Sequence, residues 1–419
     1  MKEAQMPPYG LSRSGTKSTG CACLKSHGPT YGALIFRLYA PVTMKRSAGR
    51  SIAASIHIHL SGVCGSADPA AASRFVRRIA SRWLLLSDYG AAAQRNMTIA
   101  WACILGLAVT NMIWLANTTM VFAASNWMSL LRIGLWMGLL GLCFGLALRR
   151  LGAENDRTAH LLTSVLERAD LAWRGFLPTI ALLTALVTYS YVATAAALPL
   201  RDDVLAAIDV DLGFHWPSLL RLVNSFPLFF EVLATAYDAI GPIGIGVIIW
   251  LALFRRGERL AEFIAVLSLT VIALCVVMRM VPAAGAFAFY QPAPELYANL
   301  APAGAMWTFS REFTMLRNGS LSVIDLAATT GVVSFPSFHT ILGIVTVYPL
   351  RDTRWLMGAV MAVNGTMIVA TMPVGGHHLA DVLAGAAVAV GAIIVVRRVS
   401  PLRATTLQGG GALVNSPAF

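Results

Sequence analysis

Eight long runs of apolar residues, separated by short polar segments, dominate the chain from residue 97 onward. Most runs hold about 20 residues or more, the length that an α-helix needs to cross the hydrocarbon core of a bilayer. The run at 337–350 is shorter, so it would lower its polar start below the membrane surface or thin the bilayer. The pattern predicts an all-α polytopic membrane bundle of about eight transmembrane helices. The runs cover residues 97–124, 127–148, 173–198, 227–254, 260–282, 337–350, 355–373 and 377–397.

The composition supports a membrane protein. The chain is 57% hydrophobic and 12% charged, whereas a soluble domain carries about 25% charged residues. The net charge of +12 could point to nucleic acid, but the basic residues gather in the N-terminal segment and in short loops between the apolar runs. We therefore attribute the charge to the positive-inside rule and expect no nucleic-acid partner.

The arginine-containing loops fall on one side when the runs are threaded alternately through a bilayer. That side is expected to be the cytoplasm, and both chain ends should lie there. Loops 199–226 and 283–334 then face outward. We predict a protein of the plasma (inner) membrane of a bacterium. The arginines of the inner loops are Arg149, Arg150, Arg157, Arg255, Arg256, Arg259, Arg351, Arg354, Arg397, Arg398 and Arg403.

The chain divides into four segments by composition. Residues 1–96 are basic and rich in Ser, Gly and Ala, which predicts a poorly ordered tail. A targeting peptide or a start codon assigned too early would also explain this tail, because Met97 directly precedes the first long run. We expect residues 97–148 to form an added transmembrane hairpin, residues 160–398 the main membrane domain, and residues 399–419 a cytoplasmic tail.

Two polar motifs stand where loops enter apolar helices. His377 and Asp381 are four residues apart, so on a helix the carboxylate can hold one imidazole nitrogen and leave the other free to react. Pro336 suits the first turn of a helix, whose free N–H groups can seat a phosphate oxygen, with His339 beside that seat. Both motifs are expected on the outer side. They read Ser334-Phe335-Pro336-Ser337-Phe338-His339-Thr340 and Gly375-Gly376-His377-His378-Leu379-Ala380-Asp381.

Together these motifs resemble the second and third signatures of the type 2 phosphatidic acid phosphatase superfamily, which read Pro-Ser-x-His and His-x-x-x-Asp. The first motif, preceded by Leu316-Arg317-Asn318-Gly319, is most similar to the inositolphosphotransferase branch, related to inositol phosphorylceramide synthase. The resemblance covers roughly residues 160–398 and implies a six-helix catalytic core.

The resemblance also implies a role for each motif residue. His377 would be the nucleophile that takes the phosphoryl group, and Asp381 would orient it. His339 would protonate the leaving oxygen, and Ser337 would help to bind phosphate. The neighbouring His378 is an alternative nucleophile, although it lies only three residues from Asp381.

Two features of the superfamily are missing from this chain. Ala370 and Thr371 stand where a Ser-Arg pair usually precedes the third motif, and no Lys-x6-Arg-Pro motif is present. Phosphoryl transfer needs positive charge around the equatorial oxygens. No acidic cluster is spaced for Mg²⁺, so we expect no metal and no cofactor, and arginines must supply the charge. Arg317 and Arg279 are the candidates, with Arg311 a weaker third; the alternative for each is an interfacial anchor.

We predict an integral membrane enzyme that acts on a lipid-linked phosphate at the outer face through a phosphohistidine intermediate. It would be a phosphatase if water accepts the phosphoryl group, or a transferase, for instance of inositol phosphate, if a hydroxyl group does. The intramembrane acids Glu231 and Asp238 could contribute to its pocket. Its expected partners are a lipid phosphate or phospholipid and the membrane.

The competing prediction is a transporter or scaffold that keeps a degenerate pocket. A transporter would be expected to show broken helices in repeated halves. Only Gly241-Pro242-x-Gly244 offers such a break.

Overall fold

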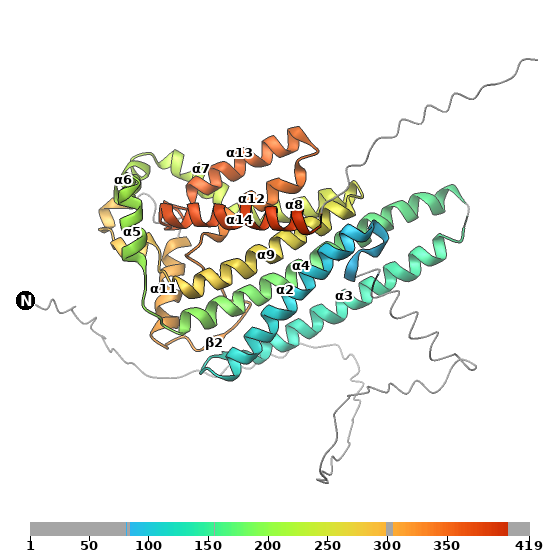
Figure 1. Ribbon diagram of the computed structural model, residues 1–419, viewed down its shortest axis with the longest axis horizontal. Helices are drawn as coiled ribbons and strands as arrows, with labels where there is room; N and C mark the ends of the chain where they lie inside the picture. Colours follow the sequence, from blue (N-terminus) through green and yellow to red (C-terminus); the bar gives the residue numbers. More distant parts are fainter. Residues whose placement is uncertain (1–80, 82–83, 155, 299–304, 401–419) are drawn as a thin grey trace, which may run out of the picture. The chain divides into compact units, whose positions relative to one another are not determined.

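The computed structural model describes residues 81, 84–154, 156–298 and 305–400 (Figure 1). Predictions for residues 1–80 and 401–419 therefore lie outside the described residues. The described part is almost entirely helical. Its first elements are η1 (Ser87–Tyr89), α2 (Ala91–Ala116), β1 (Val121–Phe122), α3 (Ala124–Leu151), α4 (Arg157–Ala195), α5 (Asp202–Asp211), α6 (Trp216–Asn224), α7 (Pro227–Asp238) and α8 (Ile240–Leu253). They are followed by α9 (Gly257–Met280), α10 (Ala286–Tyr290), η2 (Pro294–Leu296), α11 (Ala305–Arg317), β2 (Val323–Ile324), α12 (Phe338–Val347), η4 (Tyr348–Leu350), α13 (Arg354–Ala370) and α14 (Leu379–Val399).

Within the described residues, five helices are long and apolar enough to cross a membrane: α2, α3, α4, α9 and α14. The count becomes six if α6 and α7, which meet at 112°, form one bent span. Helices α8 and α13, and α12 with η4, are apolar but shorter. The predicted helical membrane architecture thus agrees with the structure, while the count of eight spans stays a prediction.

Three element boundaries differ from those predicted. Helix α2 begins at Ala91, inside the segment assigned to the tail. Helix α4 begins at Arg157 rather than near 173, because the Asp156 carboxylate caps it by accepting the backbone N–H of Thr158. The run 227–254 forms two helices, α7 and α8, with only Ala239 between them.

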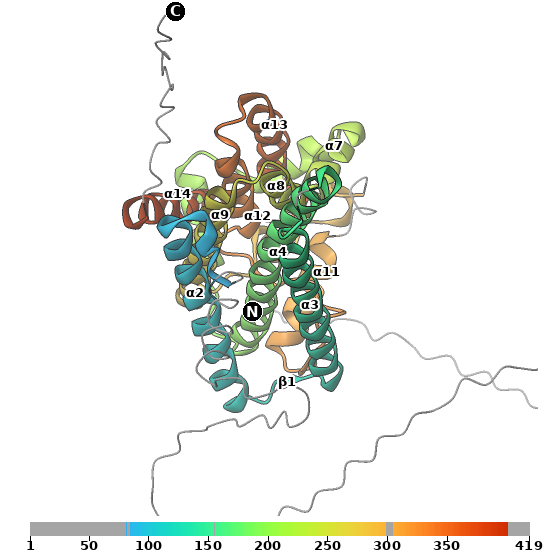
Figure 2. The same ribbon diagram turned by 90° about the vertical axis from the view of Figure 1, so that its right-hand side faces the viewer.

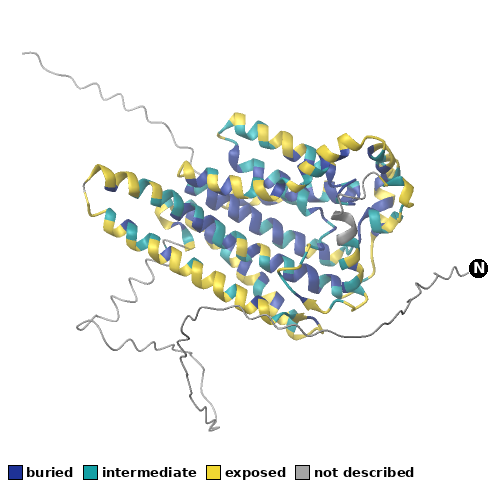
Figure 3. Ribbon diagram, turned by 180° about the vertical axis from the view of Figure 1, so that it is seen from behind, coloured by how far each residue is buried: buried dark blue, intermediate teal, exposed yellow. Residues whose placement is uncertain are grey.

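Helix α9 lies at the centre of the packing. It contacts α2, α4, α12 and α14, and 72% of its most apolar stretch is buried (Figure 3). Helix α3 is the opposite case, with 6% of its apolar stretch buried. Bilayer-facing side chains would explain this exposure, because apolar residues need no protein cover in lipid.

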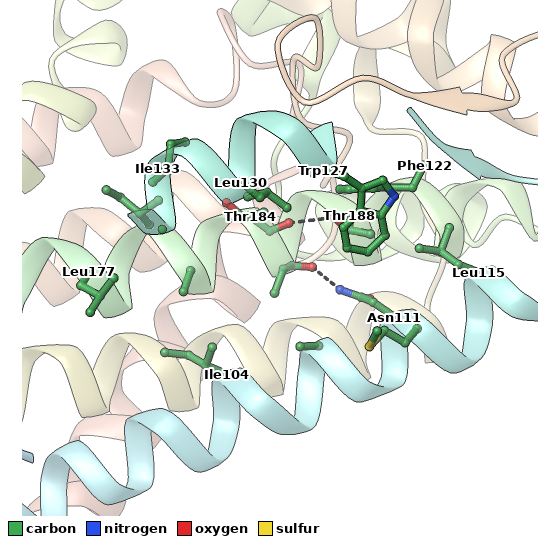
Figure 4. A pocket seen from close by; sticks show the side chains of 16 residues that line it. Ile104, Asn111, Leu115, Phe122, Trp127, Leu130, Ile133, Leu177, Thr184 and Thr188 are labelled. Atoms are coloured by element: carbon green, nitrogen blue, oxygen red, sulfur yellow. Dashed lines mark hydrogen bonds between the residues drawn. The ribbon is translucent and has the colours of Figure 1, made fainter. Parts of the chain in front are cut away.

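Helices α2 and α3 lie on either side of α4 (Figure 2). Between the three helices runs a groove of about 360 Å³ with an almost wholly apolar lining (Figure 4). The Asn111 side chain in this groove donates a hydrogen bond to the Ala185 carbonyl at 2.8 Å. This bond joins α2 to α4 and fixes their relative position along the helix axes, which apolar contacts alone would not do.

The loop end of the hairpin formed by α2 and α3 is tied to the segment that leads into the first motif. Strand β1 pairs in parallel with β2. The buried Asn126 side chain donates to the Ile324 carbonyl at 2.7 Å and accepts from the Leu326 N–H at 3.0 Å. The added hairpin is therefore joined to the rest of the bundle at its loop as well as along α4 and α9.

Charged residues from two of the predicted inner loops meet at the end of the bundle opposite to β1 and β2. The buried Glu262 carboxylate accepts from Arg351 and from the Tyr348 hydroxyl, both at 2.5 Å. Asp352 accepts from Arg259 at 3.0 Å. The loops after α8 and after η4 therefore lie at one end, as the alternating threading requires.

Helices α12 and α14 start side by side, and a glycine makes this possible. A Cβ atom at Gly385 would lie 2.6 Å from the Ser337 carbonyl oxygen. Gly391, on the same helix, has no such neighbour within 4 Å. Gly385 therefore lets α14 approach the start of α12 closely.

We expect Gly385→Ala to lower the melting temperature of the detergent-purified protein, because overpacking against backbone costs about 1–3 kcal/mol. Gly391→Ala is the matched control and should be neutral or slightly stabilising, since alanine favours helix by about 1 kcal/mol over glycine. Thermal unfolding followed by circular dichroism measures both. Equal melting temperatures for the two variants would contradict the close approach.

Candidate functional site

The two motifs meet at the paired starts of α12 and α14. The Ser337 backbone N–H donates to the Asp381 carbonyl at 3.0 Å. Ser337 is the N-cap of α12, fully buried, and its hydroxyl contacts the Thr340 hydroxyl at 3.1 Å. Pro336 therefore lies before the helix, not in its first turn as predicted, because Ser337 occupies the cap position.

The predicted pair of His377 and Asp381 is in contact. Nδ1 of His377 lies 3.1 Å from Oδ2 of Asp381, and both side chains are buried. His377 stands before α14 rather than on its face, because His378 is the N-cap and Asp381 folds back in a capping box, accepting the His378 N–H at 3.0 Å. Since the carboxylate holds Nδ1–H, Nε2 of His377 is the nitrogen left to react.

His378 is fully buried between two carboxylates of α5, which lie outside both motifs. Its Nδ1 lies 3.3 Å from Asp209 and its Nε2 3.5 Å from Asp202, the second an ion-pair contact. Burial alone would lower the pKa of His378, but the carboxylates of Asp202, Asp209 and Asp381 raise it to about 9. With both ring nitrogens facing carboxylates, His378 is poorly placed as the alternative nucleophile.

Helix α5 carries both of these acids and through them joins the loop after α9 to the start of α14. Asp202 accepts the backbone N–H groups of Ala284 and Gly285 at 2.9 and 2.8 Å. Asp209 accepts those of Leu379 and Ala380 at 3.1 and 2.8 Å. The α5 carboxylates thus fix the loop after α9 against the start of α14, where negative charge also suits the helix dipole.

His339 contacts Tyr237, which lies on α7, outside both motifs. The rings of His339 and Tyr237 stack with centroids 4.1 Å apart and planes at 19°. The Tyr237 hydroxyl lies 3.4 Å from Nδ1 of His339. His339 and His377 are close enough for their charges to interact. Helix α7, α12 and the start of α14 therefore contribute to one site.

The candidate phosphate-binding arginines lie in different surroundings. The Arg279 guanidinium lies 5.7 Å from the centre of the Trp114 ring, toward α2. Arg317 packs over Phe313 at 5.6 Å, and its charge interacts with that of Asp202. Arg311 is exposed. Arg317 thus lies close enough to Asp202 of α5 for their charges to interact, whereas Arg279 packs against the added hairpin.

The two intramembrane acids take no part in this cluster. Glu231 and Asp238 are exposed on α7. Glu231 lines a groove between α7 and α13 together with Thr235 and Thr366. No contact between these two acids and the histidines of the motifs supports their predicted contribution to the pocket.

Comparison with known proteins gives one match. Residues 203–395 match the family model of the PAP2 superfamily. The match runs from α5 to α14 and contains both motifs. No curated protein and no solved structure matches the chain. The similarity to this superfamily is therefore confirmed for these residues and suggests phosphoryl transfer of the phosphatase type, while the inositolphosphotransferase branch stays a prediction.

The raised pKa of His378 predicts a pH-dependent stability. The charged imidazole stabilises the fold fully below its unfolded pKa of about 6.5, and this contribution is lost as the pH rises through about 9. The melting-temperature difference between wild type and His378→Gln should therefore be largest near pH 6 and shrink toward pH 10. His215→Gln, at an exposed histidine bonded to Ser218, is the control. A pH-independent difference would contradict the charged state.

Proposed function

We propose that the chain is an integral membrane enzyme that moves a phosphoryl group from a lipid-linked phosphate through a phosphohistidine on His377. The observation that carries the proposal is the buried contact between Nδ1 of His377 and Asp381 at 3.1 Å, beside His339. A nucleophilic imidazole needs such a partner, which fixes its tautomer and stabilises the cation that forms on reaction.

In the proposed first step, Nε2 of His377 attacks phosphorus and the bond to the leaving oxygen breaks. His339 gives that oxygen a proton from Nε2. In the second step, water or an alcohol attacks the phosphohistidine, and the now neutral His339 takes up the proton that the attacking group loses. Water makes the enzyme a phosphatase, and a lipid or polyol hydroxyl makes it a transferase.

The site would face the outer side of a plasma membrane. The alternating distribution of arginines supports this orientation, and so does the meeting of the inner loops at the end remote from the motifs. Ser337 would act through the cap of α12 rather than by touching phosphate, because its hydroxyl is buried against Thr340.

His377→Ala should lower turnover of a lipid phosphate by about a thousandfold or more, as is usual for removal of a nucleophile. Asp381→Asn should also lower it, because the amide cannot stabilise the imidazole cation. The assay uses detergent-purified protein with phosphatidic acid, phosphatidylinositol and diacylglycerol, and identifies all phosphorus-containing products.

The products decide between the two chemistries. Free phosphate that is lost in His377→Ala indicates a phosphatase, and a new phospholipid that is lost in the variant indicates a transferase. Identical products from wild type and variant would overturn the proposed catalysis and favour the scaffold with a degenerate pocket.

Arg317 is proposed as the side chain that attracts the phosphate, since its charge interacts with that of Asp202, which places it near the site residue His378. Arg317→Gln should raise KM or lower kcat/KM by about tenfold or more, because charge-assisted contacts to phosphate are strong. Arg279→Gln should change kcat/KM far less, because that guanidinium packs on Trp114. The reverse order of effects would transfer the role to Arg279.

A further inference from the structure

Helix α3 carries one arginine within its apolar stretch. Arg132 is exposed, on a helix that packs along α4 at the edge of the bundle (Figure 2). Its guanidinium has no hydrogen bond and no ion pair to any of the described residues. A charged side chain inside a membrane segment is costly and marks a functional site, because it needs a partner. The described part of the chain supplies none, so the partner is a molecule outside it.

The position of Arg132 along α3 places its charge near one boundary of the membrane. Helix α3 has 28 residues, with Arg149 and Arg150 in its last turn. Arg132 lies about 26 Å before Arg149 along the helix axis, and the hydrocarbon core is about 30 Å thick. With Arg149 at one boundary, Arg132 lies within about 5 Å of the other. Side chains lean toward the start of their helix, so the guanidinium reaches the layer of lipid phosphates there.

The side chains around Arg132 match the rest of a lipid molecule. Trp136 follows four residues later on the same face, and its side chain is 71% exposed. Its indole N–H has no acceptor among the described residues. Met128, Leu135 and Leu139, each more than half exposed, complete the face. The face therefore offers a cation for a phosphate, a donor one turn deeper for an ester carbonyl, and an apolar surface for an acyl chain.

Charge disfavours a second copy of α3 as the occupant of this face. The helix contains no aspartate and no glutamate from Ala124 to Leu151. Two copies in one membrane would place Arg132 at the same depth, so a symmetric pair would bring two guanidinium groups together. Like charges repel strongly where water is scarce. A ligand that carries negative charge suits the face better.

We propose that this face of α3 binds an anionic phospholipid from the leaflet at the loop end of the hairpin. The phosphate contacts the Arg132 guanidinium, whose planar donors suit phosphate oxygens. The Trp136 indole N–H donates to an ester carbonyl, and an acyl chain lies along Leu135 and Leu139. A zwitterionic lipid binds less well, because its ammonium group is repelled by the guanidinium and finds no acid on α3. The inference goes beyond the proposed catalysis and rests only on the membrane location of α3.

The test follows the fluorescence of Trp136, because this side chain lies at the proposed site. Full-length protein is reconstituted in vesicles of phosphatidylcholine with increasing fractions of phosphatidylglycerol. One of the two lipids carries brominated chains, which quench indole fluorescence on contact. The Trp136 signal is the difference between each protein and the same protein with Trp136→Phe. Comparing the two labelled lipids gives the association constant of phosphatidylglycerol relative to phosphatidylcholine at this face.

We expect a relative association constant of about five or more for the wild type, the size expected for one arginine at a lipid surface. Arg132→Gln should lower it to about one, and Arg132→Lys should retain most of it because the charge stays. Arg150→Gln is the matched control. It removes another exposed arginine of α3, about 21 Å from Trp136 along the axis, and should leave the constant unchanged.

A constant near one in the wild type, or a constant that Arg132→Gln leaves unchanged, would overturn the proposal. Trp136 fluorescence that neither labelled lipid quenches would also overturn it, because lipid would then have no access to the face. The readout needs no turnover. The lipid site can therefore fail while the catalysis proposed for His377 holds, and the reverse.

Discussion

The candidate site depends on one buried carboxylate. Asp381 holds Nδ1 of His377 and the backbone N–H of His378 through its side chain, and its carbonyl accepts the N–H of Ser337. A carboxylate buried in an apolar bundle is unfavourable unless it is hydrogen-bonded or paired. The same contacts that satisfy Asp381 therefore bring the two motifs together and leave Nε2 of His377 free.

Helix α5 adds a second layer of charge around this centre. Asp202 and Asp209 enclose His378 and accept four backbone N–H groups, two from the loop after α9 and two from the first turn of α14. A buried cationic imidazole is stable only because these carboxylates surround it. The two adjacent histidines therefore have different surroundings: His378 lies between two α5 carboxylates, and His377 contacts Asp381.

Helix α9 connects the site to the rest of the bundle. Helix α9 supplies a buried centre against which α12 and α14 pack, and its last residues lead to the loop that Asp202 holds. The hairpin of α2 and α3 lies outside the residues that match the PAP2 superfamily. It joins the bundle through α4 and α9 and through the Asn126 side chain, which bonds to the backbone of Ile324 and Leu326 inside the matched segment.

The sequence alone determined the helical membrane class, the two motifs and the contact of His377 with Asp381. Long apolar runs can satisfy their backbone only as helices in lipid, and a histidine and a carboxylate four residues apart can always meet. The contacts of Asp202, Asp209 and Tyr237 with the histidines were decided by the tertiary structure. They lie more than 100 residues from the histidines that they contact, and no local pattern encodes which acid or phenol the packing of helices will bring to a histidine.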